Sequence, residues 1–518
     1  MTAPAAALDL TRHWAGYAGL AVFVLAYVLV MGEEKFGIRK SKPVVVAAGV
    51  MWAVIGAAYV RAGDHTTAGD AVRHSIGEYG ELLLFIVASM VFVNAMEDRQ
   101  VFDGLRAWLV RRRFSLRAVF WVTGLIAFLL SSQLANMTTA LVMGAVVLAV
   151  GRGHPKFIGL AFINIVVACN AGGVFSPFGD ITSLMVWQAG RAEFWDFFRL
   201  FLPALVNWIV PAAILSLAVP RGQPGGEEER VELRRGAFGV VGLFALTIVI
   251  SVIAYNTLKL PPVIGMTTGL GLLQLYGAYL RRTHPRTPAL LPAPFAPASV
   301  AAERLAPAST AAVDSAEPWA APEVDFSVPL PDDLTFGEDP LAATTDDLAV
   351  HGEPADGAPA PAAAAAAPRA EADSAFDVFA ILQRSEWDTL LFFFGIMLCV
   401  AALAQIGYLA GLSAALYGEQ GPTAANVGIG LISAVVDNIP VMYAVLTMHP
   451  PMGLSQWLLV TLTAGVGGSL LSIGSAAGVA LMGQGRGVYT FGSHLRWTWA
   501  IALGYAASIA VHLLINGR

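Results

Sequence analysis

The sequence predicts an all-α polytopic membrane protein in which two inverted-topology repeats carry re-entrant hairpins and broken transmembrane helices. Of its 518 residues, 56% are hydrophobic and only 13% are charged. A soluble domain would carry roughly 45–50% apolar and about 25% charged residues. Too few polar side chains remain to cover the surface of a soluble core of this size, so an ordinary soluble enzyme is excluded.

Ten apolar segments are predicted to be transmembrane helices, since the hydrocarbon core of a bilayer takes about 20 helical residues. They lie at roughly 13–31, 43–61, 82–96, 157–189, 200–219, 237–255, 262–280, 388–410, 456–483 and 497–515. The positive-inside rule assigns the clusters of Lys and Arg to the cytoplasm: Lys35–Lys42, Arg99–Arg117, Arg152–Lys156, Arg221–Arg235, Arg281–Arg286 and Arg486–Arg496. The first segment precedes such a cluster instead of a cleavage site, so we expect a true span with its N-terminus outside.

Two further apolar segments are predicted to enter the membrane and return. The segment at about 118–150 lies between Arg117 and Arg152, which are both assigned to the cytoplasm. The segment at about 424–448 has no Lys or Arg on either flank, so we expect it to enter from outside. Polar residues interrupt both segments near their middle, in 131–139 and in 433–440. These interruptions indicate the tips of two hairpins.

The hairpins belong to a longer repeat. A shift of 302 residues aligns Ser131 with Ser433 and Asn136 with Asn438. Each hairpin is followed by a span whose middle contains several Gly and Ser residues, at 170–180 and at 465–475. Secondary transporters with inverted repeats place their binding site at such broken helices, near the middle of the membrane. Close helix packing through small residues would account for one such stretch, but not for four at matching positions.

A long acidic segment separates parts of the second half. Residues 287–383 hold sixteen acidic and two basic residues, a net charge of −14, which leaves +8 on the rest of the chain. The segment lacks apolar periodicity, so we expect a disordered cytoplasmic linker, either a passive spacer or a regulatory element. The predicted parts are an N-terminal half (1–236), the first two helices of the second half (237–286), this linker (287–383) and the remainder (384–518).

Three carboxylates lie in apolar surroundings, where a charge is costly and indicates function. Asp437 lies at the second hairpin tip, Asp180 follows the first broken helix, and Asp388 lies near the start of its helix. Na⁺ is bound by carboxylate, amide, hydroxyl and carbonyl oxygens, which these segments supply. A carboxylate that takes either a proton or a cation is sufficient for exchange. The structural alternative for each is a helix cap, above all for Asp180 before Ile181.

His74, Glu78 and Glu81 precede the third predicted span with helical spacing. Histidine is the side chain best suited to sensing pH near neutrality. The group is therefore a candidate proton relay or pH sensor, with an ordinary solvated helix face as the alternative.

The hairpin and break residues together resemble the NhaD family of sodium/proton antiporters, in the ion transporter superfamily. The resemblance covers nearly the whole chain except the N-terminal extension and the linker, and it depends on 131–139, Asn170, Phe175–Asp180, Thr182, Met185–Gln188, Ser433, Asp437–Pro440, Gly467–Ser469 and Ile473–Gly478. It implies exchange of Na⁺, and often Li⁺, for H⁺ at the bacterial inner membrane. Carried over by position, it implies cation or proton binding by Asp437, Asn438, Ser433, Asp180, Asn136, Ser131, Asn170 and Ser475, and a relay or pH-sensing role for Asp388, His74 and Glu81.

The resemblance also bears on the partners of the protein. Na⁺, Li⁺ and H⁺ are the expected substrates, with Na⁺ at the cation-binding residues and with no cofactor, no nucleic acid and no enzymatic activity. We expect a multi-pass protein in the lipid bilayer, a homodimer, a cytoplasmic linker at 287–383 and periplasmic termini.

One position departs from the family pattern, in which each hairpin carries Ser followed by an Asp-Asn pair. Ala135 replaces the first Asp, so only Asn136 of that pair remains. The first half has thereby lost one oxygen ligand and one titratable group.

Two other functions stay open. An anion carrier of the same superfamily, for dicarboxylates or oxyanions, would suit the acid-free tip at Asn136, although Asp437 would repel an anion and no Lys or Arg is near either tip in the sequence. An intramembrane aspartyl protease could pair Asp180 with Asp437 or Asp388. That chemistry has no use for paired hairpins.

Overall fold

The computed structural model describes residues 8–112, 114–222, 233–283, 376–419 and 421–517. The chain divides into one compact unit, Met1–Arg282 with Phe376–Arg518, and a second unit, Thr283–Ala375. All regular elements in the described residues are helices. The all-α prediction is therefore confirmed for this part of the chain.

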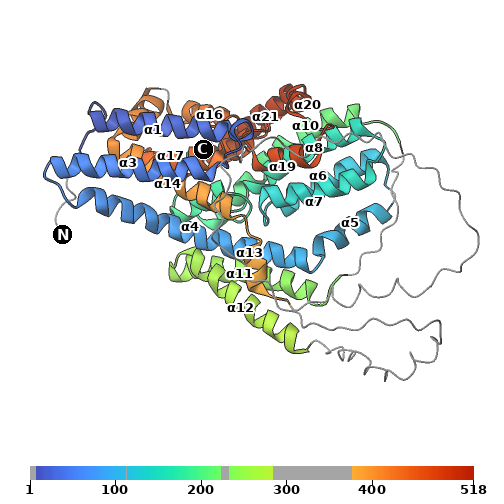
Figure 1. Ribbon diagram of the computed structural model, residues 1–518. Coiled ribbons are helices and arrows are strands. Elements are labelled where there is room, and N and C mark those ends of the chain that lie inside the picture. The colour runs from blue at the N-terminus through green and yellow to red at the C-terminus, as the bar shows by residue number, and fades with distance from the viewer. Residues whose placement is uncertain (1–7, 113, 223–232, 284–375, 420, 518) are drawn as a thin grey trace, which may run out of the picture. The chain divides into compact units, whose positions relative to one another are not determined.

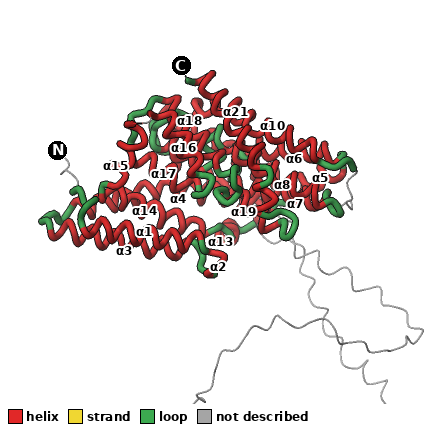
Figure 2. The backbone as a smooth tube through the Cα atoms, turned by 90° about the horizontal axis from the view of Figure 1, so that it is seen from above, coloured by secondary structure: helices red, strands yellow, loops and turns green. Residues whose placement is uncertain are grey.

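Long helices form one side of the compact unit. Helices α1 and α3 run alongside each other, and α14 lies against α3 and α4 (Figures 1 and 2). Trp52 Nε1 in α3 donates to the Leu398 carbonyl of α14 at 3.0 Å, and a Cβ on Gly395 would come within 2.7 Å of the α3 backbone. The bounds are α1 (Trp14–Met31), α2 (Glu33–Phe36), α3 (Ser41–Arg61), α4 (Thr67–Asp98) and α14 (Trp387–Ile406).

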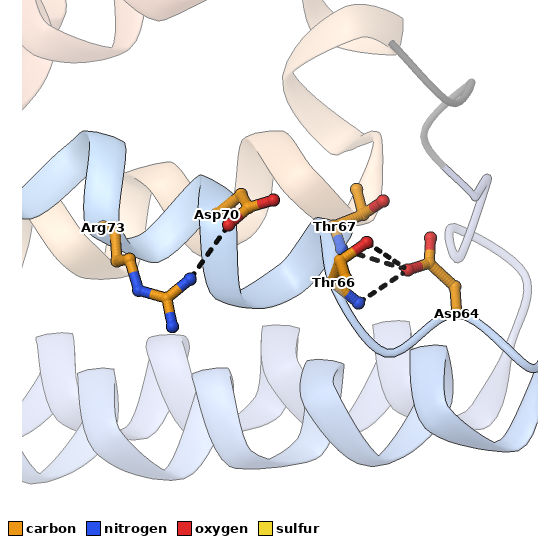
Figure 3. Close-up of polar contacts among 5 residues, drawn as sticks. All are labelled: Asp64, Thr66, Thr67, Asp70 and Arg73. Carbon is orange, nitrogen blue, oxygen red and sulfur yellow. Dashed lines mark hydrogen bonds and ion pairs between the residues drawn. The ribbon is translucent and has the colours of Figure 1, made fainter. Parts of the chain in front are cut away.

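Helix α4 begins well before the predicted start of the third span at about 82. The Asp64 carboxylate accepts the backbone N–H groups of Thr66 and Thr67 at 3.0 Å each, and the exposed pair Asp70–Arg73 follows at 2.9 Å (Figure 3). These contacts satisfy donors that a helix start leaves unpaired. The first part of α4 is polar, so a prediction based on the length of apolar segments does not include it.

Both predicted hairpins are present as helix–turn–helix elements. The first joins α6 (Leu116–Leu130) to α7 (Asn136–Val150), and the second joins α16 (Gly421–Ile432) to α17 (Asn438–Met448). Each helix has 11 to 15 residues, which is too short to cross a bilayer.

Both predicted breaks are also present. Helix α8 (Pro155–Gly173) is separated from α9 (Ile181–Gln188), and α18 (Leu454–Gly467) from α19 (Ala476–Gln484). All residues of the first break and nearly all residues of α8 and α18 are buried. Unpaired backbone groups at such depth are tolerated only inside protein or beside a water-filled cavity.

The hairpins and breaks meet in the same way in both halves. A Cβ on Gly172 would lie 2.1 Å from the Phe128 carbonyl oxygen, and one on Gly467 would lie 2.1 Å from that of Gly430. A Cβ on Gly179 would lie 2.4 Å from the Ser131 carbonyl oxygen, and one on Gly474 would lie 2.2 Å from that of Ser433. No other residue fits at such distances. These matched contacts support the predicted repeat, with a shift of 302 residues for the hairpins and 295 for the breaks.

The remaining helices complete the compact unit. Nine described helices are long and apolar enough to span a membrane. Large apolar side chains point outward from them, with Phe238 79% and Leu217 78% exposed, which suits contact with lipid. The remaining bounds are α5 (Val101–Arg111), η1 (Phe194–Leu200), α10 (Phe201–Ala218), α11 (Ala237–Leu258), α12 (Pro262–Thr283), α15 (Tyr408–Ser413), η3 (Ala414–Glu419), α20 (Phe491–Leu495) and α21 (Thr498–Asn516).

The predicted linker ends earlier than expected. Most of 287–383 lies outside the described residues, but Phe376 is buried and α13 (Val378–Gln383) is a helix whose buried residues pack on the core. The predicted end at 383 is therefore wrong. Phe376, Val378 and Ile381 bury enough apolar surface to order this stretch despite its acidic neighbours.

Candidate functional site

The tip of the first hairpin contacts the first break through polar side chains. Ser131 Oγ donates to Asn136 Oδ1 at 2.6 Å, and Asn136 Nδ2 lies 3.4 Å from Asn170 Oδ1. Gly173 keeps this contact open, because a Cβ there would come within 2.6 Å of Asn136 Oδ1. The predicted residues Ser131, Asn136 and Asn170 are thus brought together.

Asn170 also joins the two halves. Its Nδ2 donates to Ser469 Oγ at 2.8 Å, and Ser475 Oγ donates to its Oδ1 at 2.9 Å. All three side chains are buried. The two breaks, 295 residues apart in the sequence, therefore share one hydrogen-bond network.

Asp180 contacts the tip of the second hairpin. Its Oδ2 accepts from Thr182 Oγ1 at 2.7 Å and from Asn438 Nδ2 at 3.1 Å. Asp180 precedes α9, but its carboxylate makes no capping hydrogen bond to that helix. The carboxylate instead links the first break to the second half, which favours the functional interpretation over the capping one.

Asp437 caps a helix, the role that the sequence analysis gave as the alternative for each of the three acids. Its Oδ1 accepts from the Ile439 N–H at 3.3 Å, at the start of α17. The neighbouring Ser433 donates to the Ala464 carbonyl at 2.7 Å. Lys40 and Tyr27 lie close enough to interact electrostatically with Asp437. No Lys or Arg is near this tip in the sequence, but the fold brings Lys40 from a distant segment.

The other predicted residues lie away from this network. Asp388, in the first turn of α14, accepts a hydrogen bond from Ser41 Oγ at the start of α3. His74 Nε2 lies 3.3 Å from Glu78 Oε1, and Tyr443 donates to Glu78 Oε2 at 3.3 Å. Asp388 thus joins two helix starts, and Glu78 joins α4 to α17.

A cavity of about 280 Å³ reaches Asp180 from one side. Ala135 and Thr138 of the first hairpin line it together with Asp180, Glu97 and Arg384. The basic clusters predict that this side faces the cytoplasm. Ala135, where the family pattern has Asp, therefore faces the same cavity as Asp180.

A second cavity, of about 570 Å³, is lined by His74, Glu78 and Glu81. It shares no lining residue with the first, among the residues that the structure describes. Helix α9 contributes to both, with Leu184 in the first and Met185 in the second. The two cavities thus meet α9 at adjacent positions along the helix.

Sequence reasoning assigned no role to two members of the network, Thr182 and Ser469. Thr182 lies two residues after Asp180, where its hydroxyl reaches the carboxylate. Ser469 is the first serine of the second break. The signal available for both was a hydroxyl inside or beside a break.

Comparison with known proteins identifies the family. Residues 6–275 and 337–465 match a family model described as "Citrate transporter". The Na(+)/H(+) antiporter NhaD of Halomonas elongata is 49% identical over 514 residues, which cover 99% of this chain and 91% of the relative. The chain belongs to the NhaD antiporter family. NhaD proteins of Alkalimonas amylolytica and Vibrio cholerae are 48% and 47% identical, covering 99% and 98% of this chain and 93% and 94% of theirs.

The NhaD relationship confirms the resemblance predicted from the hairpins and breaks. The sodium/proton antiporter 1 of Arabidopsis thaliana is a more distant relative, 27% identical over 96% of this chain and 72% of its own length. These relatives are transporters, which argues against the aspartyl protease alternative.

Proposed function

We propose that this NhaD-family protein is a secondary transporter that exchanges Na⁺ for H⁺ at the network around Asp180. The observation that carries the proposal is the contact of the Asp180 carboxylate with Asn438, because it places a carboxylate between the two halves and beside a cavity. The relatives named as Na⁺/H⁺ antiporters support the same activity.

The donor set suits a hard monovalent cation. Carboxylate, amide and hydroxyl oxygens of Asp180, Asn170 and Thr182 are ligands of the kind that such ions take. A carboxylate that holds a proton cannot also contribute its full charge to a Na⁺ site. Loading with one ion therefore excludes the other, which couples their opposite movements.

Asp437 supplies a second carboxylate at the corresponding hairpin tip. We propose that it assists cation and proton binding from the second half, together with its chain neighbours Ser433 and Asn438 and with Ser475 of the second break. Lys40 is a competing positive charge. Asp388, His74 and Glu81 act outside the network, with His74 and Glu81 in the second cavity as the route for protons.

The proposal extends to location and assembly. The protein lies in the bacterial inner membrane with both termini in the periplasm and the segment 287–383 in the cytoplasm, where the basic clusters are expected. Li⁺ is proposed as a second cation, and a homodimer as the assembled form.

An anion transporter is the second candidate, because the matching family model is described as "Citrate transporter". Asp180 lines the first cavity, and its negative charge would repel a carboxylate substrate there. The cation proposal therefore accounts better for the residues at the site.

Everted membrane vesicles test both candidates. A pH gradient is established, and NaCl, LiCl or sodium-free citrate is added while the gradient is followed with a fluorescent dye. Collapse of the gradient with NaCl, and its loss in Asp180→Asn, supports Na⁺/H⁺ exchange. Vesicles that respond to citrate and not to NaCl would establish the anion carrier instead.

A further inference from the structure

The second break is held by a segment outside the membrane spans. Residues 485–497 lie between α19 and α21 and belong to none of the nine candidate spans. His494, in this segment, is fully buried. Its Nε2 lies 2.8 Å from the Ser469 carbonyl oxygen, and its Nδ1 lies 2.8 Å from the Tyr489 hydroxyl, which in turn lies 2.9 Å from Ser472 Oγ.

The donor and the acceptor in each of these hydrogen bonds follow from the chemistry of the groups. The Ser469 carbonyl can only accept, so His494 Nε2 carries a hydrogen. Burial lowers the pKa of His494 to about 4, so the imidazole is neutral near pH 7. Its Nδ1 then accepts from the Tyr489 hydroxyl, and the Tyr489 oxygen is left to accept from Ser472 Oγ. Each donor in the chain is matched with an acceptor.

The backbone of the break needs such support. Ser472 has φ of 67°, a left-handed conformation that residues other than glycine rarely adopt. Such conformations persist only where their surroundings hold them. Thr498 Oγ1 adds a second bond from the same side, to the Leu470 carbonyl at 2.8 Å.

Ser469 connects this support to the proposed cation site. Its carbonyl accepts from His494, and its hydroxyl accepts from Asn170 Nδ2 at 2.8 Å. The matching position in the first break, Val174, has no side-chain oxygen, and its carbonyl accepts from Ser183 of the adjoining helix α9. The second break is thus the one whose geometry depends on a remote segment.

We propose that His494, acting with Tyr489, is a positioning residue that sets the second break so that Ser469 and Ser475 face Asn170. The inference rests on the proposed Na⁺/H⁺ exchange. Loss of the His494 bonds lets Ser469 and Ser472 shift, which weakens cation binding more than it slows the turnover of the loaded carrier.

Two substitutions separate the two bonds of His494. Gln places an amide N–H near the position of Nε2, and Asn places an oxygen near that of Nδ1. The test measures the half-saturating Na⁺ concentration and the maximal rate in everted vesicles for wild type, His494→Ala, His494→Gln, His494→Asn and Tyr489→Phe, at equal amounts of membrane-inserted protein.

His512→Gln is the matched control. His512 is also fully buried, and its Nε2 lies 3.0 Å from the Ser455 carbonyl, but it belongs to α21 and touches neither break. It reproduces the loss of a buried histidine without changing the hydrogen bonds of Ser469 or Ser472.

We expect His494→Ala to raise the half-saturating Na⁺ concentration about tenfold, since one or two buried hydrogen bonds are lost. In His494→Gln the half-saturating Na⁺ concentration should stay close to the wild-type value. Tyr489→Phe should raise it about threefold, and His512→Gln should leave it unchanged. Wild-type values in both His494→Ala and Tyr489→Phe would overturn the inference, as would equal losses in His494→Gln and His494→Ala. If His494→Ala fails to insert, Tyr489→Phe and His494→Gln decide alone. A wild type that does not respond to Na⁺ overturns the proposed function and this inference with it.

Discussion

The two halves of the compact unit repeat one backbone arrangement but place their carboxylates differently. In the first half the break carries Asp180 and the hairpin tip carries Ala135. In the second half the matching break position is Ser475 and the matching tip position is Asp437. The backbone contacts nonetheless agree, because a Cβ added to Gly172 or to Gly467 would lie 2.1 Å from a hairpin carbonyl oxygen.

The residues that form the shared backbone contacts therefore differ from the residues that carry the carboxylates. The close backbone contacts need glycine in both halves, because any side chain would collide with a carbonyl oxygen. The carboxylates are free of that constraint, so each half can keep one in a different place. Asp180 and Asp437 consequently meet different partners, Asn438 for the first and the α17 backbone for the second.

The largest effect is expected from Asp180→Asn compared with Asp437→Asn. The first removes the charge that accepts from Thr182 and Asn438, and we expect Na⁺-dependent H⁺ movement to fall about a hundredfold, the range for charged hydrogen bonds. Asn caps helices as well as Asp does, so Asp437→Asn loses only its charge and we expect about a tenfold loss. Rates in everted vesicles measure both. The reverse ranking would place the centre of the site at the second tip.

Gly172→Ala and Gly467→Ala test the backbone contacts that the two halves share. Both add a methyl group 2.1 Å from a carbonyl oxygen, so both should destabilise the fold by about 1–3 kcal/mol. Thermal inactivation of the purified protein measures this. Gly49→Ala is the control, because nothing lies within 4 Å of a Cβ at that position in α3. A clear difference between the two test variants would contradict an equivalent packing of the halves.

Ala135→Asp makes the two hairpin tips alike. Ala135 lines the cavity that reaches Asp180, so a second carboxylate there should lower the half-saturating Na⁺ concentration by about three- to tenfold. Transport assays at several Na⁺ concentrations measure the shift, with Ala135→Asn as the uncharged control. A weaker response to Na⁺ in the Asp variant alone would show that this half functions better without the charge.

The smallest effect is expected at Asp64, a carboxylate outside both hairpins and breaks. Hydrogen bonds from Thr67 and Thr66 lower its pKa to about 2, so it stabilises the fold above its ordinary value of 3.8 and loses this effect as the pH falls toward 2. Asp64→Ala should lower the melting temperature by about 1–2 °C at pH 7 and by less at pH 3. Asp70→Ala is the control, since its exposed pair with Arg73 contributes little. A full loss of transport in Asp64→Ala would contradict a purely structural role.

The sequence was sufficient to locate the hairpins and breaks, because polar runs inside apolar segments mark them directly. It predicted the start of α4 poorly, since His74 and Glu78 are polar although they belong to the same helix as the apolar span. It also placed the linker end too late, because the few buried residues of α13 are surrounded by acidic ones.

The partners of the three acids could not be predicted from the sequence. The hydrogen bond between Asp180 and Asn438 joins residues 258 positions apart. The approach of Lys40 to Asp437 depends on the same long-range folding. Local pattern identifies candidate ligands, but tertiary contacts decide which of them meet.

The absence of a shared lining residue between the two cavities, among the residues that the structure describes, has an energetic consequence. A continuous water path would let ions flow down the membrane voltage, which is equivalent to about 2.3 kcal/mol per charge for each 100 mV. With the path divided, each ion crosses only when the protein changes shape, so turnover is set by a conformational step and no single-channel conductance is expected.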